Sequence, residues 1–357
     1  MISATGCGDS PLRFAPGATM SDTGMIFSPI ARGGGAFVVH RMLSEQIPGY
    51  QLSGYHPWLA LAPGNLFPES NATGVRMLHT TPESAPLFRR KGIPSVITFH
   101  NYVLDRYMAN YSSVPQQVYY QCFLLPWTRM ALKQATAVTA VSHFLAGLIR
   151  REIGFEGQIP VIYNGIDTQR FKPAPGRSSR RKTCRILFSG NLIRRKGAQW
   201  LFDIARKIPS NACIYYTGGL RTRHRLPSHP ALRPLGAVSY GEMPAVYRRM
   251  DLLLMPTVRE GFGLAVAEAM ASALPVVASN CSSIPELVDS GKGGFLCPVG
   301  DVAGFVETIT RLVGDPGLRR SMGAYNRKKA VRLFSMETTV HAYRRLFANL
   351  MHRTPRA

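Results

Sequence analysis

The chain has 357 residues, of which 45% are hydrophobic and 18% charged, which is an ordinary globular composition with room for two domains of roughly 150 residues each. Its 43 Lys and Arg residues outnumber 20 Asp and Glu residues, so the formal net charge is +23. This excess predicts anionic partners such as phosphorylated ligands, nucleic acid or an acidic membrane surface. No apolar run of about 18 residues and no helix-turn-helix or zinc-finger pattern occurs, which argues against a membrane-spanning helix and against specific nucleic-acid binding.

The amino-terminal residues and the cysteines bear on the compartment. Residues 1–24 lack the apolar core of a secretory signal and predict a disordered tail. The six cysteines are scattered without a C-x-x-C pair, which favours buried thiols in a reducing cytosol over disulfides or a zinc site; they are Cys7, Cys122, Cys184, Cys213, Cys281 and Cys297. We therefore expect a cytoplasmic protein.

In the first half, short apolar runs alternate with amphipathic segments. The runs predict strands at 25–30, 75–80, 93–101, 135–142 and 159–166. The amphipathic segments predict helices at 36–46, 113–134 and 143–154. A glycine turn at 31–35 separates the first strand from the first helix. Continuous apolar strands that alternate with helices are typical of a parallel sheet covered on both faces.

A linker and a second α/β region follow. Residues 168–182 combine Pro, Ser and basic residues without periodicity, which predicts a linker. The alternation then restarts, with strands predicted at 184–190, 212–219, 251–256 and 275–279. Helices are predicted at 197–208, 243–250, 264–273 and 283–291, and over most of 301–350. We therefore expect one domain at 25–167, a second at 183–334, a final helix and tail at 335–357, and a ligand site in the cleft between the domains.

The segment SGNLIRRKG (189–197) has the features of an anion site. A strand ends at Gly190, and Arg194, Arg195 and Lys196 precede a helix that begins near Gly197. Backbone N–H groups at a helix start, together with neighbouring cations, suit a diphosphate. The alternative is a solvated basic loop that caps a helix.

The segment VREGFGLAVAEAMASALPVVAS (258–279) places two carboxylates around a glycine turn. Gly261 and Gly263 allow a sharp turn that exposes N–H groups at the start of a helix, which would favour a phosphate. Glu268, one turn into that helix, could accept hydrogen bonds from the two hydroxyls of a ribose, and Glu260 could hold the hydroxyls of a second sugar. The spacing predicts a clamp on a nucleotide-sugar. The alternative has Glu260 exposed to solvent and Glu268 in a salt bridge.

The surrounding residues resemble a known family. EGFGLAVAEAMASALPVVAS (260–279) resembles the E-x7-E signature of the retaining GT-B glycosyltransferases of family four. Five further segments resemble the family in the same order: SPIARGGGAFVVHRML (28–43), ITFHN (97–101), AVTAVSHFLAGLI (137–149), VIYNGIDTQRFKP (161–173) and FSGNLIRRKG (188–197). The resemblance implies the α/β GT-B fold, in which two Rossmann-like domains face each other across a cleft and a C-terminal helix crosses back to the first domain.

The resemblance also implies roles for individual residues. Glu260, Lys196 and His100 would form the catalytic set: Glu260 and His100 would contact the donor sugar, and Lys196 the diphosphate. The other donor-binding residues would be Glu268, Gly261, Phe262, Gly263, Leu264, Arg194, Arg195, Asn191, Gly34 and Gly35. Asn191 stands where the family often has Arg, which leaves Arg194 or Arg195 as the substitute. For His100 the alternative is a packed core histidine, and His79 is expected to be structural.

The function that the resemblance implies is the retaining transfer of a hexose from a UDP- or GDP-linked donor. The acceptor would be a glycan or a lipid-linked precursor of a cell-surface polysaccharide such as lipopolysaccharide. No cofactor or metal is expected, because the chain has no Asp-x-Asp motif and Lys and Arg would replace Mg²⁺. The excess of positive charge predicts a peripheral position at the anionic inner face of the plasma membrane. The alternatives are a basic, non-catalytic protein that binds nucleic acid or an anionic polymer on the same scaffold, and an epimerase or phosphorylase of this fold.

Overall fold

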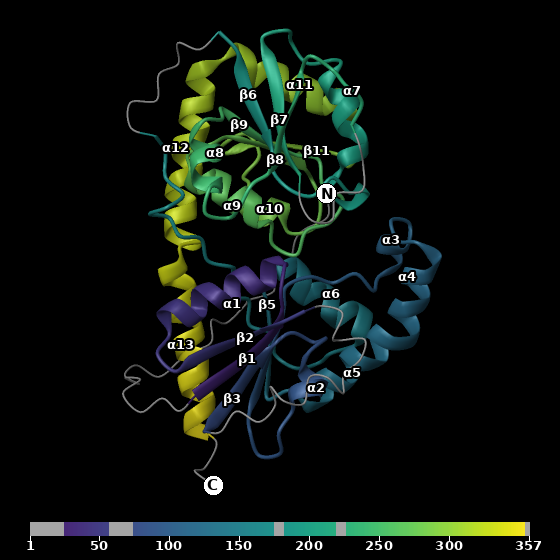
Figure 1. The fold of residues 1–357 in the computed structure, drawn as a ribbon, viewed down its shortest axis with the longest axis vertical. Coiled ribbons are helices and arrows are strands. Elements are labelled where there is room, and N and C mark those ends of the chain that lie inside the picture. Colours follow the sequence, from purple (N-terminus) through teal and green to yellow (C-terminus); the bar gives the residue numbers. More distant parts are fainter. Residues whose placement is uncertain (1–24, 57–73, 175–181, 219–225, 354–357) are drawn as a thin grey trace, which may run out of the picture.

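The computed structural model describes residues 25–56, 74–174, 182–218 and 226–353. The tail expected at 1–24 lies outside this range. Figure 1 shows two α/β domains, one above the other, with two long C-terminal helices running along one side of both. In the described part of the chain, no helix combines the length and the apolar character needed to cross a membrane.

The first domain contains a five-stranded parallel sheet in the order β2-β1-β3-β4-β5. Its strands are β1 (Met25–Ala31), β2 (Tyr50–Tyr55), β3 (Val75–Thr80), β4 (Ser95–Phe99) and β5 (Ala137–Ala140). Its helices are α1 (Gly35–Gln46), α2 (Ala85–Phe88), α3 (Arg106–Ala109), α4 (Val114–Tyr119), α5 (Leu125–Gln134) and α6 (His143–Ile153). The central strands β1, β3 and β4 are almost wholly buried, which explains their continuous apolar sequences.

Two predictions for this domain were wrong in detail. The strand expected at 159–166 is reduced to isolated bridges of Val161 and Ile166. The helix expected at 113–134 is interrupted between α4 and α5 by a π-helical turn, Tyr120–Leu124. Pro126 follows this turn and has no N–H group for the regular helical hydrogen bond, which is the physical reason for the interruption.

The second domain contains a six-stranded parallel sheet in the order β11-β10-β9-β6-β7-β8. Its strands are β6 (Cys184–Phe188), β7 (Ala212–Gly218), β8 (Leu232–Ala237), β9 (Leu252–Met255), β10 (Val276–Ser279) and β11 (Gly294–Cys297). Its helices are α7 (Leu201–Ala205), α8 (Met243–Arg248), α9 (Leu264–Ala271), α10 (Ile284–Leu287), α11 (Val302–Gly314) and α12 (Pro316–Leu333). The helix expected at 197–208 is shorter: a 3-10 turn, Ala198–Trp200, precedes α7, and α7 ends at Ala205.

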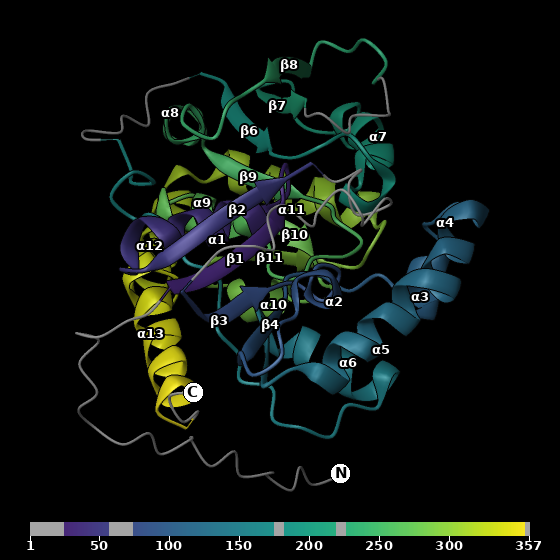
Figure 2. The same ribbon diagram turned by 60° about the horizontal axis from the view of Figure 1, so that its bottom comes forward.

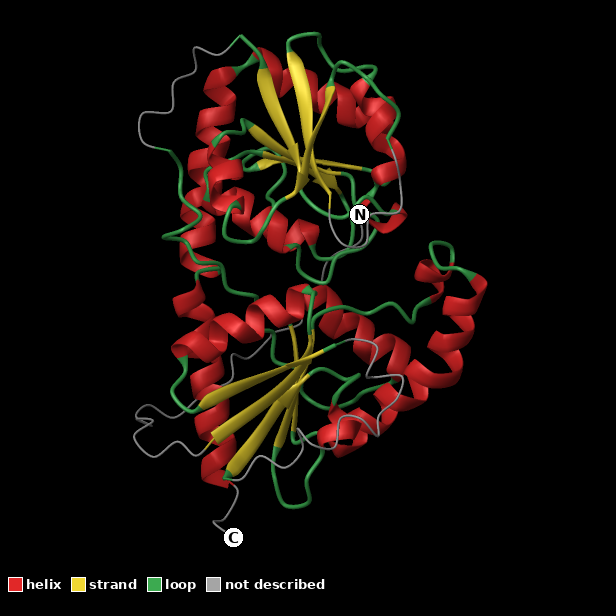
Figure 3. Ribbon diagram, viewed as in Figure 1, coloured by secondary structure: helices red, strands yellow, loops and turns green. Residues whose placement is uncertain are grey.

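The last helix, α13 (Met336–Arg353), leaves the second domain and packs on the first. Figure 3 shows it below α12, beside the sheet of the first domain. Its buried face, which contains Tyr343 and Phe347, joins the core around Val39 and Leu43 of α1. The expected crossover helix is therefore present. At the other connection, Phe171 is fully buried against the second domain, so the first residues of the expected linker are packed.

The cysteines were predicted to be buried, and this is correct for only some of those that the structure describes. Cys184 and Cys297 are buried, and Cys213 and Cys281 are partly buried. Cys122, however, is exposed on the π-helical turn of the first domain, so the prediction was wrong there.

Candidate active site

Two neighbouring strands of the second domain bring the predicted donor-binding loops together. β6 and β9 pair in parallel, so the loops that follow them leave the same edge of the sheet. The first loop ends in the 3-10 turn Arg194–Lys196, and the second leads into α9. They touch at Gly197, whose φ is +81° and where a Cβ would lie 1.8 Å from the carbonyl oxygen of Pro256. Only glycine fits this crossing of the loops.

The crossing places Lys196 against Glu260. Lys196 Nζ lies 2.6 Å from Glu260 Oε1, which also accepts a 2.9 Å hydrogen bond from Thr257 Oγ1. Both charged side chains are largely buried, with 17% and 8% exposed, so Glu260 is not the solvent-exposed carboxylate of the alternative interpretation. Burial opposes ionisation of Glu260, but the positive charges of Lys196 and Arg195 outweigh it and lower the pKa of the carboxyl. Burial in turn lowers the pKa of Lys196, although Glu260 partly opposes the effect.

Glu268 lies about one turn into α9 from the glycine loop and is also buried. Its Oε2 accepts a 2.8 Å hydrogen bond from the Tyr247 hydroxyl, and no described residue forms an ion pair with it. Burial raises the pKa of Glu268 to about 7, against the ordinary 4.5, while the Tyr247 hydrogen bond and the charge of Lys196 partly offset the rise. The carboxyl thus has hydrogen-bonding capacity that its protein partner leaves unused.

This raised pKa predicts a dependence of stability on pH. Between about pH 4.5 and 7 the folded chain holds the Glu268 proton more tightly than the unfolded chain, so stability falls as pH rises through this window. Glu268→Gln keeps the shape and removes the titration. We expect the variant to lose about 1–3 kcal/mol less free energy of unfolding across this pH window than the wild type does, and to bind nucleotide more weakly. Urea unfolding at pH 5 and pH 8 measures the first effect; equal pH dependence of the variant and the wild type would contradict it.

The remaining predicted residues of the first loop differ in their surroundings. Arg195 is half-buried, and its Nη1 donates a 3.1 Å hydrogen bond to the carbonyl of Arg259 in the second loop. Its own carbonyl accepts a 2.8 Å hydrogen bond from the Val258 amide. Arg194 is exposed, and Asn191 is half-buried. Arg195 therefore lies with Lys196 and Glu260, whereas Arg194 points to solvent.

The glycine loops of both domains meet at the domain junction. A Cβ on Gly261 would lie 2.0 Å from the carbonyl oxygen of His100 at the end of β4. A Cβ on Gly35 would lie 3.2 Å from Leu264 Cδ1 at the start of α9. Ser142 Oγ donates a 2.7 Å hydrogen bond to the Gly261 carbonyl. The predicted residues of the two domains thus form one cluster.

Three other predicted positions have mainly backbone roles. Gly34 caps the amino end of α1, with open space around its Cα. Gly263 precedes α9 with φ of +99°, in the left-handed region that favours glycine. The Phe262 ring is 2% exposed and packs on Tyr163 and Phe334, at ring distances of 5.8 and 5.5 Å. Only the backbone of Phe262 is therefore available to a ligand.

Two residues that sequence reasoning missed join the domains beside this cluster. Glu286 of α10 accepts hydrogen bonds from the His143 and Phe144 amides, at 2.9 and 2.7 Å, and so caps α6 of the other domain. Arg259 forms a buried ion pair with Asp105 and lies over the rings of Tyr107 and Phe144. The hydrogen-bonded partners are more than 140 residues apart in the chain, and we find no local signal that predicts either contact.

His100 belongs to a buried network of histidines. Its Nε2 lies 3.1 Å from Nε2 of His40, and a side-chain hydrogen bond with Asn164 also acts on the ring. His40 Nδ1 lies 2.8 Å from the Tyr50 hydroxyl, which is also 2.8 Å from Nδ1 of His79. Burial lowers the pKa of His100 to about 4, and lowers those of His40 and His79 well below the ordinary 6.5, so all three rings are neutral at pH 7. Since one proton is shared between two facing Nε2 atoms, the tautomers of His40 and His100 are linked.

We therefore expect His40 to position His100. His40→Phe fills the volume but removes the hydrogen bond, and should lower kcat about tenfold with little change in KM for the donor. His40→Gln keeps a polar group near His100 and should recover part of the loss. Thermal melts check that both variants fold. A His40→Phe enzyme with wild-type kcat and unchanged pH profile would show that the contact is structural only.

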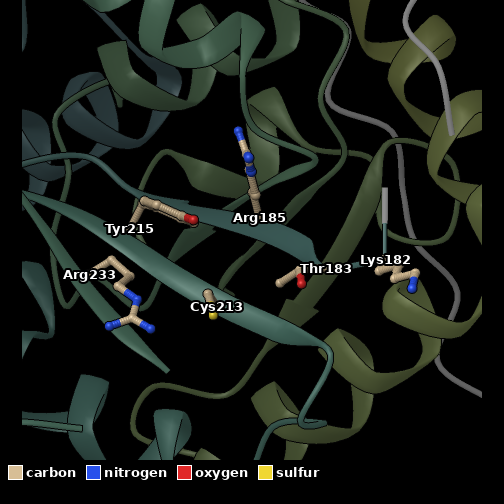
Figure 4. A pocket seen from close by; sticks show the side chains of 6 residues that line it. All are labelled: Lys182, Thr183, Arg185, Cys213, Tyr215 and Arg233. Carbon is tan, nitrogen blue, oxygen red and sulfur yellow. The ribbon is translucent and has the colours of Figure 1, made fainter. Parts of the chain in front are cut away.

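A surface cavity of about 390 Å³ lies at the other end of the second sheet. Figure 4 shows its lining, which includes Lys182, Arg185, Tyr215 and Arg233. These residues are at the amino ends of β6, β7 and β8, away from the loops described above. None of the predicted site residues lines it.

The fold is shared with solved glycosyltransferase structures. Sucrose-phosphate synthase from Thermosynechococcus elongatus matches with a TM-score of 0.76 at 18% identity, covering 92% of this chain and 100% of that chain. Anabaena HepE in complex with UDP and glucose matches with a TM-score of 0.71 at 17% identity, covering 91% and 99%. These matches, with the two parallel-sheet domains, define the GT-B fold.

The sequence comparisons show the family. Residues 25–170 match the family described as Glycosyltransferase Family 4, and residues 183–315 match the family described as Glycosyl transferases group 1. The chain therefore belongs to the glycosyltransferases that combine these two domains.

Two curated relatives show how far the sequence similarity extends. N-acetyl-alpha-D-glucosaminyl L-malate synthase of Bacillus anthracis is 27% identical over 240 residues, which cover 62% of this chain and 62% of the relative. A GDP-mannose-dependent alpha-(1-6)-phosphatidylinositol monomannoside mannosyltransferase of Mycolicibacterium smegmatis is 28% identical over 236 residues, covering 58% and 62%. The matched region thus spans less than two thirds of either relative.

Proposed function

We propose that the chain is a retaining glycosyltransferase that moves a hexose from a UDP- or GDP-linked donor to a glycan or lipid-linked acceptor in cell-surface polysaccharide synthesis. The observation that carries the proposal is the buried pair of Lys196 and Glu260, with Glu268 farther along the same loop and helix. In a solvated basic loop Lys196 would be exposed, whereas here its side chain is largely buried. The donor class is supported by a relative named for GDP-mannose and by a solved structure that contains UDP and glucose.

The geometry supports a role for each residue of the cluster. Lys196 and Arg195 would hold the diphosphate, with Arg195 in place of the arginine missing at Asn191, because Arg195 and not Arg194 lies beside Glu260. The amides of the glycine loop and of the first turn of α9 would contribute further donors. Glu268 would accept hydrogen bonds from the ribose, and Glu260 and His100 would contact the sugar.

The proposed reaction requires no cofactor. The bond between the anomeric carbon and the phosphate oxygen breaks, and a bond to the acceptor oxygen forms on the same face, which retains configuration. The proton of the acceptor hydroxyl passes to the departing phosphate oxygen. The leaving nucleoside diphosphate gains negative charge, and Lys196 and Arg195 would stabilise it as fixed cations in a dry site. We propose that they make a divalent metal unnecessary.

The excess of positive charge supports a working position at the anionic inner surface of the plasma membrane. A lipid-linked acceptor would be available there. We include this cytoplasmic, membrane-peripheral location in the proposal.

The test is hydrolysis of four donors, UDP-glucose, UDP-galactose, UDP-N-acetylglucosamine and GDP-mannose. Each is measured once with EDTA and once with Mg²⁺. The proposal expects release of one nucleoside diphosphate in EDTA, lost in Glu260→Ala. No hydrolysis of any donor, together with no binding of UDP or GDP, would overturn it and favour the anionic-polymer binder. Hydrolysis that depends on Mg²⁺ would overturn the metal-independent part alone.

A further inference from the structure

The exposed apolar side chains of this protein are concentrated on one feature. We name residues 106–134, which comprise α3, α4, the π-helical turn and α5, the helical arm. Among the described residues, seven large apolar side chains are exposed, and six are on the helical arm: Tyr107, Val114, Val118, Tyr119, Phe123 and Met130. The seventh, Val331, is on α12. Single exposed apolar residues are ordinary, but such a cluster indicates a contact surface.

No element in the described part of the chain covers the outer side of the helical arm. α4 and the π-helical turn bury none of their residues, and Val114 and Phe123 are 72% and 65% exposed. Figures 1 and 2 both show α4 projecting from the first domain with no described element outside it. The inner face is fixed, because Ala131 and Leu132 of α5 are buried and Trp127 Nε1 donates a 2.9 Å hydrogen bond to the Glu83 carbonyl. α5 therefore fixes the helical arm to the first domain.

The charge of the helical arm identifies its partner. Residues 106–151 contain no Asp or Glu. Arg106, Arg129 and Lys133 are exposed on the same helices as the apolar side chains. Apolar and aromatic side chains flanked by Lys and Arg are the combination that an anionic lipid surface accepts. A twofold contact with a second copy would instead bring these cations together, which disfavours self-association.

The helical arm also borders the candidate active site. The Arg259 guanidinium, one residue before Glu260, lies 5.0 Å from the centre of the Tyr107 ring. Tyr120 of the π-helical turn lies within reach of the charge of Arg195, which opposes the rise that burial causes in the pKa of this phenol. A surface that holds the helical arm would therefore hold the site close to itself.

We propose that the helical arm inserts its exposed apolar side chains into an anionic lipid bilayer and holds the active site against the membrane surface. The choice of a lipid-linked acceptor rests on the proposed function, but the docking itself is independent of it. Val118 and Phe123 would enter the headgroup region, and Arg129 and Lys133 would contact lipid phosphates.

The experiment is flotation of the full chain with vesicles of phosphatidylcholine, with and without phosphatidylglycerol. We expect binding to the anionic vesicles that weakens with salt. The double variant Val118→Ser/Phe123→Ser should lower the partition coefficient at least about tenfold, because two apolar side chains lose their burial. The double variant Arg129→Gln/Lys133→Gln should lower it about thirtyfold at low salt.

Matched controls come from α12. Val331→Ser, and Arg320→Gln/Lys328→Gln, change exposed residues of the same kinds and should leave binding within about twofold of wild type. Equal losses in the controls would mean that overall charge and not the helical arm binds lipid, and would overturn the proposal. Wild-type binding by both arm variants would also overturn it, as would a concentration-dependent dimer that the arm variants abolish while lipid binding persists.

Donor hydrolysis in solution separates this proposal from the proposed function. The arm variants lie outside the Lys196–Glu260–Glu268 cluster and should hydrolyse the donor as the wild type does. Arm-dependent vesicle binding without any donor hydrolysis would support the docking surface and contradict the transferase. Donor hydrolysis with no vesicle binding at low salt would support the transferase and contradict the docking surface.

Discussion

Lys196→Ala is expected to lower the turnover of the donor by about 10³-fold and to weaken nucleotide binding by a smaller factor. The lysine is held 2.6 Å from Glu260 in a largely buried position, so in the proposed reaction it would meet the leaving diphosphate without first shedding water. Removal of one fixed group that stabilises developing negative charge costs about 10²–10³ in rate, and the low dielectric of this site increases the effect. Initial rates at saturating and at low donor concentration measure the two effects separately.

The same substitution leaves Glu260 buried without its cation, which destabilises the fold by about 3 kcal/mol. Lys196→Ala/Glu260→Ala removes both charges and should recover much of the stability but none of the activity. Lys207→Ala, at an exposed lysine just after α7, is the matched control and should behave as the wild type. If Lys196→Ala folds and keeps more than about a tenth of the wild-type rate, the proposed role of the lysine is wrong.

Gly261→Ala is expected to abolish most of the activity without unfolding either domain. An added Cβ would lie 2.0 Å from the backbone carbonyl of His100, and a backbone atom at a strand end cannot swing away as a flexible side chain could. The loops must therefore separate, which also stretches the hydrogen bond from Ser142 to the Gly261 carbonyl. Because a displacement of about 1 Å in a site can cost about 10² in rate, we expect at least a hundredfold loss.

Three measurements test this prediction. Donor hydrolysis gives the loss of rate, circular dichroism shows that both domains remain folded, and small-angle X-ray scattering should show an increased radius of gyration. Gly147→Ala is the control, since this glycine lies within α6 with no atom within 4 Å of an added Cβ. It should keep full activity and gain about 0.5–1 kcal/mol in stability. Wild-type activity in Gly261→Ala would show that the junction opens freely and that the close contact has no part in the reaction.

The two largest expected effects arise at one place, where loops of both domains meet. Glu286, through the amino end of α6, and Arg259, through Asp105, hold the same junction together. The contribution of each domain to the site therefore depends on the position of the other.

The sequence by itself predicted the elements whose environment is uniform along their length. Strands β1, β3, β4, β6, β9 and β10 were predicted as continuous apolar runs, because the interior strands of a parallel sheet are covered on both faces. The three strands that were not predicted, β2, β8 and β11, all lie at a sheet edge. Of these, β2 and β8 are only partly buried and contain Gly54, Pro234 and Gly236, so their sequences lack the apolar signal.

In the candidate site, too, the sequence predicted some features and the tertiary structure decided others. The sequence located the glycine turns, the basic turn and both glutamates, since turn geometry and helix starts depend on adjacent residues. Only the tertiary structure decided that Lys196 pairs with Glu260, that Arg195 and not Arg194 lies beside them, and that His40 contacts His100. It also decided that Glu286 caps a helix of the other domain. These contacts join residues 60 or more positions apart. Their energies depend on burial and on which strands are neighbours, and the local sequence encodes neither.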